Sequence, residues 1–305
     1  MSWRYGVRML DTVASSPPRV AVILTVFNRA DLTVRCLDAL FAQDLLAADL
    51  PGVELDVVLV DDGSTDGTGE IVAERFPAVR VLRGDGQRFW NGGMRMAWAD
   101  ALSRDPDVTM WLNDDTILYP SALRDLLDTL RSVGGDEVAD AEVIVAGATV
   151  DPDTRTVNYS GVAQHPVRRL RFDLIEPNGR PQQADTMNGN AVLVPRAVVS
   201  RLGTLARAYT HSMGDYDYGL RARLAGFSIW ITPDVVGECP SNPGFVATGD
   251  VAGDLQRLRG TKHLPTDEWQ TFATRWAGPA WPLYWLSPYL RRTVAVLRTA
   301  VGTSA

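Results

Sequence analysis

The stretch "VLVDDGSTDGTG", Val58 to Gly69, runs from an apolar series directly into two adjacent carboxylates. An unbroken run of valine and leucine is typical of a strand buried on both faces of a sheet. A turn after such a strand needs only one Asp or Asn, yet Asp61 and Asp62 are followed by a third carboxylate, Asp66. Because buried charge is costly without donors, Asp61 and Asp62 require partners, either backbone amides of the "GSTDGT" turn or the base and ribose of a nucleoside. For Asp66 we favour a helix cap.

The segments around this stretch alternate between buried-strand and amphipathic-helix patterns. Repeated strand and helix units indicate an α/β fold with a mostly parallel sheet covered on both faces. The expected strands are 19–27, 54–60, 79–82 and 108–112, and the expected helices are 30–43, 66–76, 92–103 and 121–131.

From about Asp136 the alternation changes. We expect strands at 141–150 and 191–195 and helices at 195–202 and 215–225, with a hairpin and a mobile loop between residues 151 and 186, where Pro, Arg and Asn are frequent.

Composition excludes several classes of protein. The chain has 305 residues, 46% of them hydrophobic, so it can bury a large core. A net charge of -7 argues against binding nucleic acid through its phosphates. Two cysteines, Cys36 and Cys239, form no disulfide framework and favour a reducing compartment. The first ten residues lack the apolar core of an export signal, and prolines and arginines interrupt the apolar C-terminal stretch. We therefore expect a cytoplasmic protein.

Polar residues recur at the predicted carboxyl ends of the strands, where open α/β sheets bind ligands. Asn113, Asp114 and Asp115 follow the strand 108–112 as the aspartates follow 54–60. Such oxygen ligands suit Mg²⁺ or Mn²⁺, and Mg²⁺ usually takes one or two carboxylates together with substrate phosphates. No phosphate-binding loop of the GKS or GKT type accompanies them, which argues against kinase or ATPase chemistry. The alternative is an ordinary turn.

Four segments, taken in order, resemble glycosyltransferase family 2. They are "VILTVFNRADLTVRCLDAL" (22–40), "VLVDDGSTDGT" (58–68), "WLNDDTIL" (111–118) and "MGDYDYGLRARLAGFSIW" (213–230). The likeness is to its bacterial rhamnosyl- and polysaccharide-type transferases and spans about residues 19–231. It implies the GT-A fold, in which a Rossmann-like sheet continues into a mixed acceptor-side half. It also implies a nucleoside-diphosphate sugar donor of UDP or dTDP type, a divalent metal, inversion at the anomeric carbon, and a glycan or lipid-linked acceptor.

The resemblance assigns roles around the donor. Asn113 takes the first place of the family's Asp-x-Asp motif and Asp115 the second, which makes Asp115 the metal ligand and leaves the part of Asp114 open. Trp90 and Asn91 would shape the donor-sugar pocket, and the Gly92–Gly93 pair would let backbone approach the diphosphate at a helix start, although such pairs also occur without ligands. Residues expected to contact the nucleoside are Thr25, Phe27, Asn28, Asp61 and Asp62, with Asn113 and Asp114 at the nucleotide.

On the acceptor side, Asp215 stands where the family has the Asp of a Glu-Asp pair, with Gly214 in place of the Glu. Asp215 would act as the base that deprotonates the acceptor hydroxyl, in the first turn of a helix. Glu238 replaces a histidine of many relatives and would be a second metal ligand, or else a solvated residue at a strand end. Asn188, Gly189, Asn190 and His211 would line the acceptor cleft, unless they serve as turn and surface residues.

These expectations divide the chain into an N-terminal extension (1–18), a transferase domain (19–265, with halves 19–135 and 136–265) and an aromatic and basic helical segment (266–305). The last segment either lies on a membrane surface, packs on the domain, or joins subunits. Two rival functions stay open. A sugar-1-phosphate nucleotidylyltransferase would share the architecture but normally has a Gly-rich basic loop after its first strand, where this chain reads "TVFNRADL". A non-catalytic binding module would account for Asn113 and Gly214.

Overall fold

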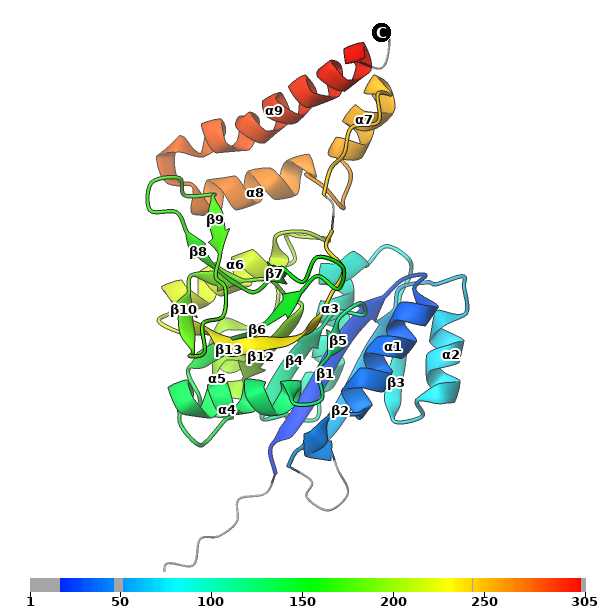
Figure 1. Cartoon of the computed structure of the whole chain (residues 1–305), viewed down its shortest axis with the longest axis vertical. Coiled ribbons are helices and arrows are strands. Elements are labelled where there is room, and N and C mark those ends of the chain that lie inside the picture. Colours follow the sequence, from blue (N-terminus) through cyan, green and yellow to red (C-terminus); the bar gives the residue numbers. More distant parts are fainter. Residues whose placement is uncertain (1–16, 47–51, 243, 303–305) are drawn as a thin grey trace, which may run out of the picture.

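The computed structural model describes residues 17–46, 52–242 and 244–302. The predicted extension 1–18 and the sequence examined for an export signal fall almost wholly outside these residues. The described chain forms one large twisted sheet with helices on both faces, and a layer of C-terminal helices lies beyond one end of the sheet (Figure 1).

The first half of the sheet is parallel, as the apolar runs predict. β1 pairs with β2 on one side and with β4 on the other, and β2 pairs with β3. The strands are buried because helices cover both faces. Cys36 and Leu37 of α1 pack in one hydrophobic cluster, and Met94 and Trp98 of α3 pack in the other. The elements are β1 (Arg19–Val26), α1 (Ala30–Phe41), η1 (Asp44–Leu46), β2 (Glu54–Asp61), α2 (Thr68–Arg75), β3 (Val79–Arg83), α3 (Phe89–Leu102) and β4 (Val108–Leu112).

The second half is mixed. The sheet order is β10-β13-β6-β12-β4-β1-β2-β3, in which β12 runs antiparallel to both β4 and β6, while β13 runs parallel to β6. A separate three-stranded sheet, β11-β8-β9, contains the expected hairpin. The elements are β5 (Ile117–Leu118), α4 (Ala122–Gly134), β6 (Val143–Val150), β7 (Val157–Tyr159), β8 (Gly161–Gln164), β9 (Phe172–Leu174), β10 (Gln182–Ala184), β11 (Thr186–Met187), β12 (Ala191–Pro195), α5 (Arg196–Leu202), α6 (Gly214–Leu224) and β13 (Ser228–Glu238).

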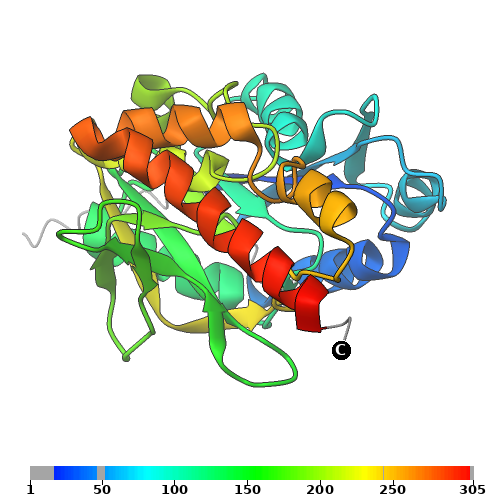
Figure 2. The same cartoon turned by 90° about the horizontal axis from the view of Figure 1, so that it is seen from above.

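The C-terminal helices lie over the carboxyl ends of the parallel strands. They are α7 (Val251–Leu258), α8 (Thr266–Trp276), the short η2 (Gly278–Ala280) and α9 (Trp281–Gly302). Seen from above, α9 crosses obliquely over this end of the molecule (Figure 2). In the described part of the chain, no helix combines the length and apolar character that crossing a bilayer requires.

One helix starts earlier than predicted. α3 begins at Phe89, not at Gly92, so the glycine pair lies about one turn inside the helix. A Cβ atom at position 93 would lie 2.0 Å from the Thr25 hydroxyl oxygen, so Gly93 permits close packing of α3 on β1. Gly93, which was predicted to mark the helix start, therefore serves contact between the helix and the strand.

Candidate functional site

A cleft of about 910 Å³ opens at the carboxyl ends of the strands, beneath the C-terminal helices. Its walls come from the ends of β1 and β4, the β8–β9 hairpin, the start of α6 and one face of α8. Asp115 and Asp215, which are a hundred residues apart in sequence, both line it. The predicted site residues that line it are Thr25, Phe27, Asp62, Trp90, Asn113, Asp114, Asp115, Asn188, Gly189, Asn190, His211 and Asp215. Those that do not line it are Asn28, Asp61, Asn91, Gly92, Gly93 and Glu238.

The two aspartates after β2 have different surroundings. Asp62 lines the cleft and accepts hydrogen bonds from the backbone amides of Gly86 (3.0 Å) and Phe89 (2.8 Å). Asp61 accepts one from the amide of Ser64 (2.8 Å), and its second, buried oxygen has no partner within the described chain. Backbone amides thus supply most of the hydrogen-bond donors that the two carboxylates need, and of the two only Asp62 lines the cleft.

Asp66 and Asn28 tie neighbouring loops together. Asp66 accepts hydrogen bonds from the amides of Thr68 (3.0 Å) and Ala30 (3.2 Å), so it caps the starts of α2 and α1, as favoured from sequence. Asn28 has a left-handed backbone (φ 51°), which Asn tolerates, and its side-chain oxygen accepts from the amide of Thr65 (2.7 Å). Asn28 therefore shapes the β1 turn and does not line the cleft.

An arginine occupies the acidic corner of the cleft. The Arg29 guanidinium lies 3.2 Å from an Asp114 oxygen and 2.8 Å from an Asp115 oxygen. Burial raises the pKa of Asp114 to about 7, although the charge of Arg29 opposes the shift. The other Asp114 oxygen is buried and has no partner among the described residues. This unpartnered oxygen and the Asp115 carboxylate are the oxygen ligands that Mg²⁺ or Mn²⁺ prefers. The corner therefore fits a divalent ion once the Arg29 guanidinium moves away from the two carboxylates.

Glu238 does not join this corner. Its carboxylate is held by Arg155 and by the Tyr119 hydroxyl (3.2 Å), and it lies outside the cleft lining. No group of three or more His, Cys, Asp or Glu side chains suited to a metal is found among the residues that the structure describes. The assignment of Glu238 as a second metal ligand is therefore not supported by its position. The arginine partner could not be foreseen because it comes from a distant turn.

The Asn113 side chain is held by a hydrogen bond from Trp90. Its side-chain oxygen accepts a hydrogen bond from the Trp90 indole (2.8 Å), and both residues line the cleft. A Cβ atom at Gly189 would lie 2.7 Å from the Trp90 ring and 3.4 Å from Asp215. Only glycine fits between them, so the backbone of Gly189 alone separates Trp90 from Asp215.

Asp215 lies in the first turn of α6, as predicted. One of its carboxylate oxygens accepts a hydrogen bond from the Gly189 amide (3.1 Å), and the other from the Tyr216 amide (2.8 Å). Burial nevertheless raises the pKa of Asp215 to about 6. The side chain is only partly exposed, toward the cleft. A carboxylate with this pKa and access is suited to take a proton near neutral pH.

Asn91 serves the loop before α6, not the donor pocket. It is fully buried, and its side-chain amide donates to the carbonyls of Ala206 (2.8 Å) and Tyr209 (2.6 Å). Its oxygen would lie 2.2 Å from a Cβ atom at Gly214. This contact gives a physical reason for glycine at the position where the family has glutamate. Asn91 and Gly93 thus have packing roles, and the contributions of Asn91, Gly92 and Gly93 to donor binding stay predictions.

The acceptor-side residues lie together in the cleft. Asn188, Gly189 and Asn190 precede β12, and His211, in the loop before α6, lines the same cleft. Burial, and then the nearby charge of Lys262, lower the pKa of His211 to about 4. His211 is therefore neutral at physiological pH and can exchange hydrogen bonds but carries no charge.

Several lining residues had no sequence assignment. Arg29 follows the first strand, and Lys262 is the only lysine of the chain. Aromatic residues from the hairpin, α6 and α8 complete the walls. The signal that could have drawn attention to α8 is its aromatic content, but helical spacing alone does not distinguish a core contact from a cleft contact. These aromatic lining residues are Phe172, Tyr216, Trp269 and Phe272.

Comparison with known proteins agrees with this arrangement. The sequence profile described as Glycosyl transferase family 2 matches residues 21–197, more than half of the chain. The chain belongs to glycosyltransferase family 2. This family 2 chain is 26% identical over 235 residues to Glycosyltransferase AglE of Haloferax volcanii, covering 76% of the chain and 70% of AglE. It is 25% identical over 219 residues to an N-acetylglucosaminyl-diphospho-decaprenol L-rhamnosyltransferase of Mycobacterium tuberculosis, covering 63% of the chain and 67% of that protein.

Solved structures share the fold. Mannosyltransferase PcManGT from Pyrobaculum calidifontis, in complex with GDP-Man and Mn²⁺, has a TM-score of 0.53 and 21% identity, covering 94% of this chain and 74% of that one. TarS of S. aureus in complex with UDP-GlcNAc has a TM-score of 0.53 and 16% identity, covering 84% of this chain and 70% of that one. At these identities the likeness concerns the fold, which confirms the expected GT-A architecture.

Proposed function

We propose that this family 2 glycosyltransferase moves a sugar from a nucleoside diphosphate to a hydroxyl of a glycan or lipid-linked acceptor, with inversion at the anomeric carbon. The observation that supports this most strongly is the convergence of Asp115 and Asp215 on one cleft. In our proposal residues 19–135 hold the donor and residues 136–265 hold the acceptor. Four rhamnosyl- and polysaccharide-type motifs, and the family membership, point to the same chemistry.

Asp215 would supply the base. The reaction forms a bond between an acceptor oxygen and the anomeric carbon, breaks the bond to the diphosphate, and releases one proton from the acceptor hydroxyl. With a pKa of about 6, Asp215 is mostly ionised at neutral pH and can take that proton. Its two backbone donors hold the carboxylate in place. In our proposal the acceptor oxygen attacks from the side opposite the leaving group, which inverts the anomeric carbon.

The acidic corner would serve the donor diphosphate. Asp115 would hold Mg²⁺ or Mn²⁺, with Asp114 beside it. A bound divalent ion would offset the negative charge of the departing diphosphate. Arg29 contacts both carboxylates, and once displaced it would be free to contact phosphate oxygens. Asp62, Thr25 and Phe27 line the part of the cleft that we assign to the nucleoside, of UDP or dTDP type.

The test is direct. The purified chain is incubated with UDP-, dTDP- and GDP-sugars, Mg²⁺ or Mn²⁺ and a panel of glycoside acceptors, and release of nucleoside diphosphate is followed, with the anomeric configuration of the product read by NMR. Inverted product from one donor supports the proposal. Retained configuration contradicts inversion, and pyrophosphate formed from a sugar phosphate and a nucleoside triphosphate would favour a nucleotidylyltransferase. Nucleotide binding without transfer to any acceptor would favour a non-catalytic module.

We also propose that the outer face of α9 contacts an anionic membrane surface. Five apolar side chains spaced three or four residues apart form an exposed stripe, with exposed fractions of 72% for Leu283, 43% for Leu286, 57% for Leu290, 47% for Val294 and 50% for Leu297. Residues at this spacing share one helix face.

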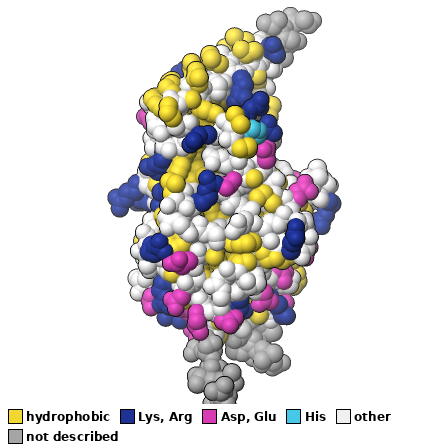
Figure 3. All heavy atoms as spheres, turned by 90° about the vertical axis from the view of Figure 1, so that its left-hand side faces the viewer, with side chains coloured by type: hydrophobic (Ala, Val, Ile, Leu, Met, Phe, Trp, Pro, Cys, Tyr) yellow, Lys and Arg dark blue, Asp and Glu magenta, His cyan; other side chains and the backbone are white. Residues whose placement is uncertain are grey.

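Charge around the stripe suits anionic lipid. α9 contains three arginines and no acidic residue, whereas the whole chain carries a net charge of -7. The adjoining β8–β9 loop presents Val167, 78% exposed, beside Arg168 and Arg169, and the Arg169 amide donates to the Tyr284 hydroxyl of α9 (3.2 Å). Figure 3 shows hydrophobic and basic side chains gathered over this upper part of the molecule. Such a face binds interfaces through apolar burial and attraction to anionic headgroups. The buried, unpaired Cys36 and Cys239 suit the cytoplasmic side of that membrane.

Vesicle flotation tests this contact. The native chain should float with phosphatidylcholine vesicles containing phosphatidylglycerol, and the double variant Leu286→Glu with Leu290→Glu should not. The control is Leu224→Glu, which charges a leucine that is 77% exposed on α6. Equal flotation of the native chain and the double variant contradicts the proposal. A dimer in light scattering that only the double variant loses would instead assign the face to a second copy.

A further inference from the structure

One wall of the cleft is aromatic and has no assigned ligand. Leu170 and Phe172 of the β8–β9 hairpin, Tyr216 of α6, and Trp269 and Phe272 of α8 all line the same cleft as Asp215. Tyr216 directly follows the proposed base, so this wall begins beside the reacting position.

The rings of the wall support one another. Phe172 and Tyr216 meet edge to face, with centroids 4.9 Å apart, and Trp269 stacks on Phe272 at 5.8 Å. Asn188 also lines the cleft, and its side chain lies near the Tyr216 hydroxyl. Lys262, whose ammonium has no hydrogen bond or ion pair within the described chain, lines the cleft near His211. The wall therefore presents aromatic surface bordered by groups that can bind hydroxyls.

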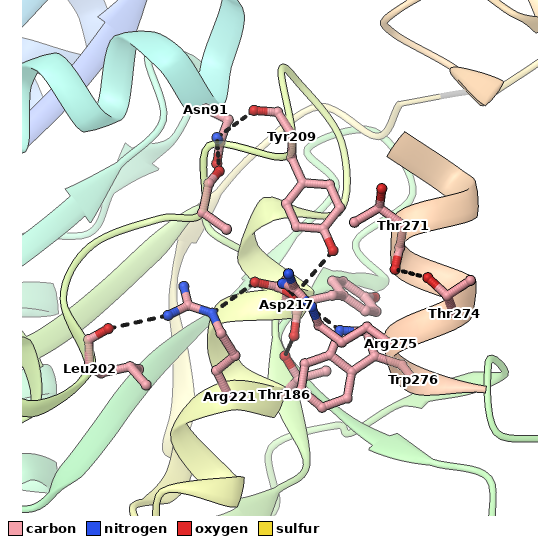
Figure 4. Close-up of polar contacts among 12 residues, drawn as sticks. Asn91, Thr186, Leu202, Tyr209, Asp217, Arg221, Thr271, Thr274, Arg275 and Trp276 are labelled. Atoms are coloured by element: carbon pink, nitrogen blue, oxygen red, sulfur yellow. Dashed lines mark hydrogen bonds and ion pairs between the residues drawn. The ribbon is translucent and has the colours of Figure 1, made fainter. Parts of the chain in front are cut away.

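A buried carboxylate anchors α8 in this position. Asp217, fully buried in α6, accepts from the Arg275 guanidinium (2.6 Å) and the Trp276 indole (3.0 Å) of α8. On its own side it accepts from Arg221 (2.8 Å) and the Tyr209 hydroxyl (3.1 Å) (Figure 4). Because every donor points at one desolvated carboxylate, the network fixes the docking of α8.

The other end of α8 holds the loop that carries His211. Glu268 accepts a hydrogen bond from the amide of Thr210 (2.9 Å), and the carbonyl of Thr210 accepts one from the amide of Asn91 (2.9 Å). Hydrogen bonds near both ends of α8 thus hold the helix, and with it the aromatic wall, beside α6. A rigid aromatic surface binds a ligand with little loss of side-chain entropy.

We propose that this wall is an acceptor subsite that takes a sugar ring by stacking its C–H face on the aromatic surface, with ring hydroxyls bound by Asn188, His211 and Lys262. The inference rests on the proposed transferase function and deepens it. A lipid chain suits the site less, because the wall carries polar borders while the exposed leucines of α9 lie outside the cleft. The volume of about 910 Å³ is at the upper end for small-ligand sites, about 300–1,000 Å³, and leaves space for a donor and an acceptor ring.

The experiment measures sugar binding without a donor. Saturation-transfer NMR is recorded with the methyl glycosides of glucose, galactose, mannose, rhamnose and N-acetylglucosamine. The variants are Trp269→Ala, Trp269→Phe and Leu170→Ala, and the matched control is Trp281→Ala, which removes a tryptophan outside the cleft lining. Melting curves and UDP binding report whether each variant is folded.

We expect at least one glycoside to bind the native chain. Affinity should fall about tenfold in Trp269→Ala, fall less in Leu170→Ala, and be retained in Trp269→Phe and Trp281→Ala. Absence of binding to the native chain, or equal binding by Trp269→Ala, overturns the subsite. If Trp269→Ala unfolds, an unchanged affinity in Leu170→Ala overturns it instead. Sugar transfer from a donor without glycoside binding would contradict the subsite and leave the transferase proposal intact. Glycoside binding without sugar transfer from any donor would contradict the transferase proposal and leave the binding site intact.

Discussion

Asp215 illustrates how a single side chain can be prepared for proton transfer. Two backbone amides orient its carboxylate, and burial raises its pKa to about 6. The bare backbone of Gly189 separates it from Trp90. Function and stability oppose each other here, because the ionised form that accepts a proton is also the form that burial penalises.

Replacing Asp215, the proposed base, should therefore lower activity and increase stability. Asp215→Asn should lower transfer by about 10²- to 10⁴-fold, the usual contribution of a general base. Folding raises the pKa of Asp215 in the native chain. The native chain therefore has its full stability below about pH 4, where Asp215 is protonated, and loses stability as pH rises through about 6. At neutral pH the free energy of unfolding of the variant should be about 1–3 kcal/mol higher than that of the native chain. Chemical denaturation at two pH values checks this, and a difference that persists at pH 4 would contradict the assignment.

The pH dependence of transfer should report the same group. The rate at saturating donor and low acceptor should rise as pH increases through about 6 and then level off, because only ionised Asp215 accepts the proton. His211, whose pKa is lowered to about 4, is neutral throughout this range and should not contribute a second step, whereas a further change near pH 7 would report Asp114, whose pKa is raised to about 7. A rate independent of pH between 5 and 8 would exclude Asp215 as the base.

At the scale of elements, the sequence predicts strands better than helix starts. The unbroken apolar run of β4 and the pairing of β1 with β2 and β4 follow from burial on both faces, which leaves a strong pattern. The start of α3 was misplaced because Gly93 is required by contact with Thr25, which no local pattern reveals. Asp62 and Asp115 could be placed in the cleft from strand ends, and the same reasoning applies to Arg29, which follows β1 as Asp115 follows β4. The contribution of α8 could not be predicted in this way, since tertiary packing alone brings it there.

The glycine pair of α3 provides a matched test of this explanation. Gly93→Ala should destabilise the fold by about 1–3 kcal/mol, because its Cβ atom would lie 2.0 Å from the Thr25 oxygen. Gly92→Ala meets only an ordinary contact of 3.4 Å with the Arg88 side chain and should be neutral or stabilising by up to about 1 kcal/mol. Urea unfolding of both variants measures the difference. Equal stability would show that α3 can move away from β1.

Docking of α8 on α6 should depend on the Asp217 carboxylate. Asp217→Asn removes the charge that two arginines share, and loss of a buried pair typically costs about 3–5 kcal/mol. The control is Asp173→Asn, which breaks a pair with Arg171 whose side chains are 52% and 53% exposed; such a pair contributes at most about 1 kcal/mol. Denaturant unfolding followed by tryptophan fluorescence compares the two. Similar losses for both variants would contradict a structural role of the buried network.

At the scale of the whole molecule, the arrangement separates two surfaces. In Figure 3 most acidic side chains lie in the lower part of the view, among basic ones, and the basic, apolar C-terminal helices lie at the end where the cleft opens. Attraction of that end to an anionic surface would bring the cleft close to a lipid-linked acceptor. The same layer of helices supplies the aromatic wall of the cleft, so the C-terminal segment contributes to the site and is not a mere appendage.

The central claim is that two carboxylates divide the work in one cleft, Asp115 at the donor and Asp215 at the acceptor. Isothermal titration of UDP, dTDP and GDP in the presence of Mn²⁺, combined with transfer assays, tests it most directly on the native chain, Asp115→Ala and Asp215→Asn. We predict that Asp215→Asn binds the preferred nucleotide as tightly as the native chain, and that Asp115→Ala binds it at least about tenfold more weakly, a difference of about 1.4 kcal/mol. Both variants should lose most of their transfer activity. Unchanged nucleotide affinity in Asp115→Ala, or full turnover in Asp215→Asn, would contradict this division.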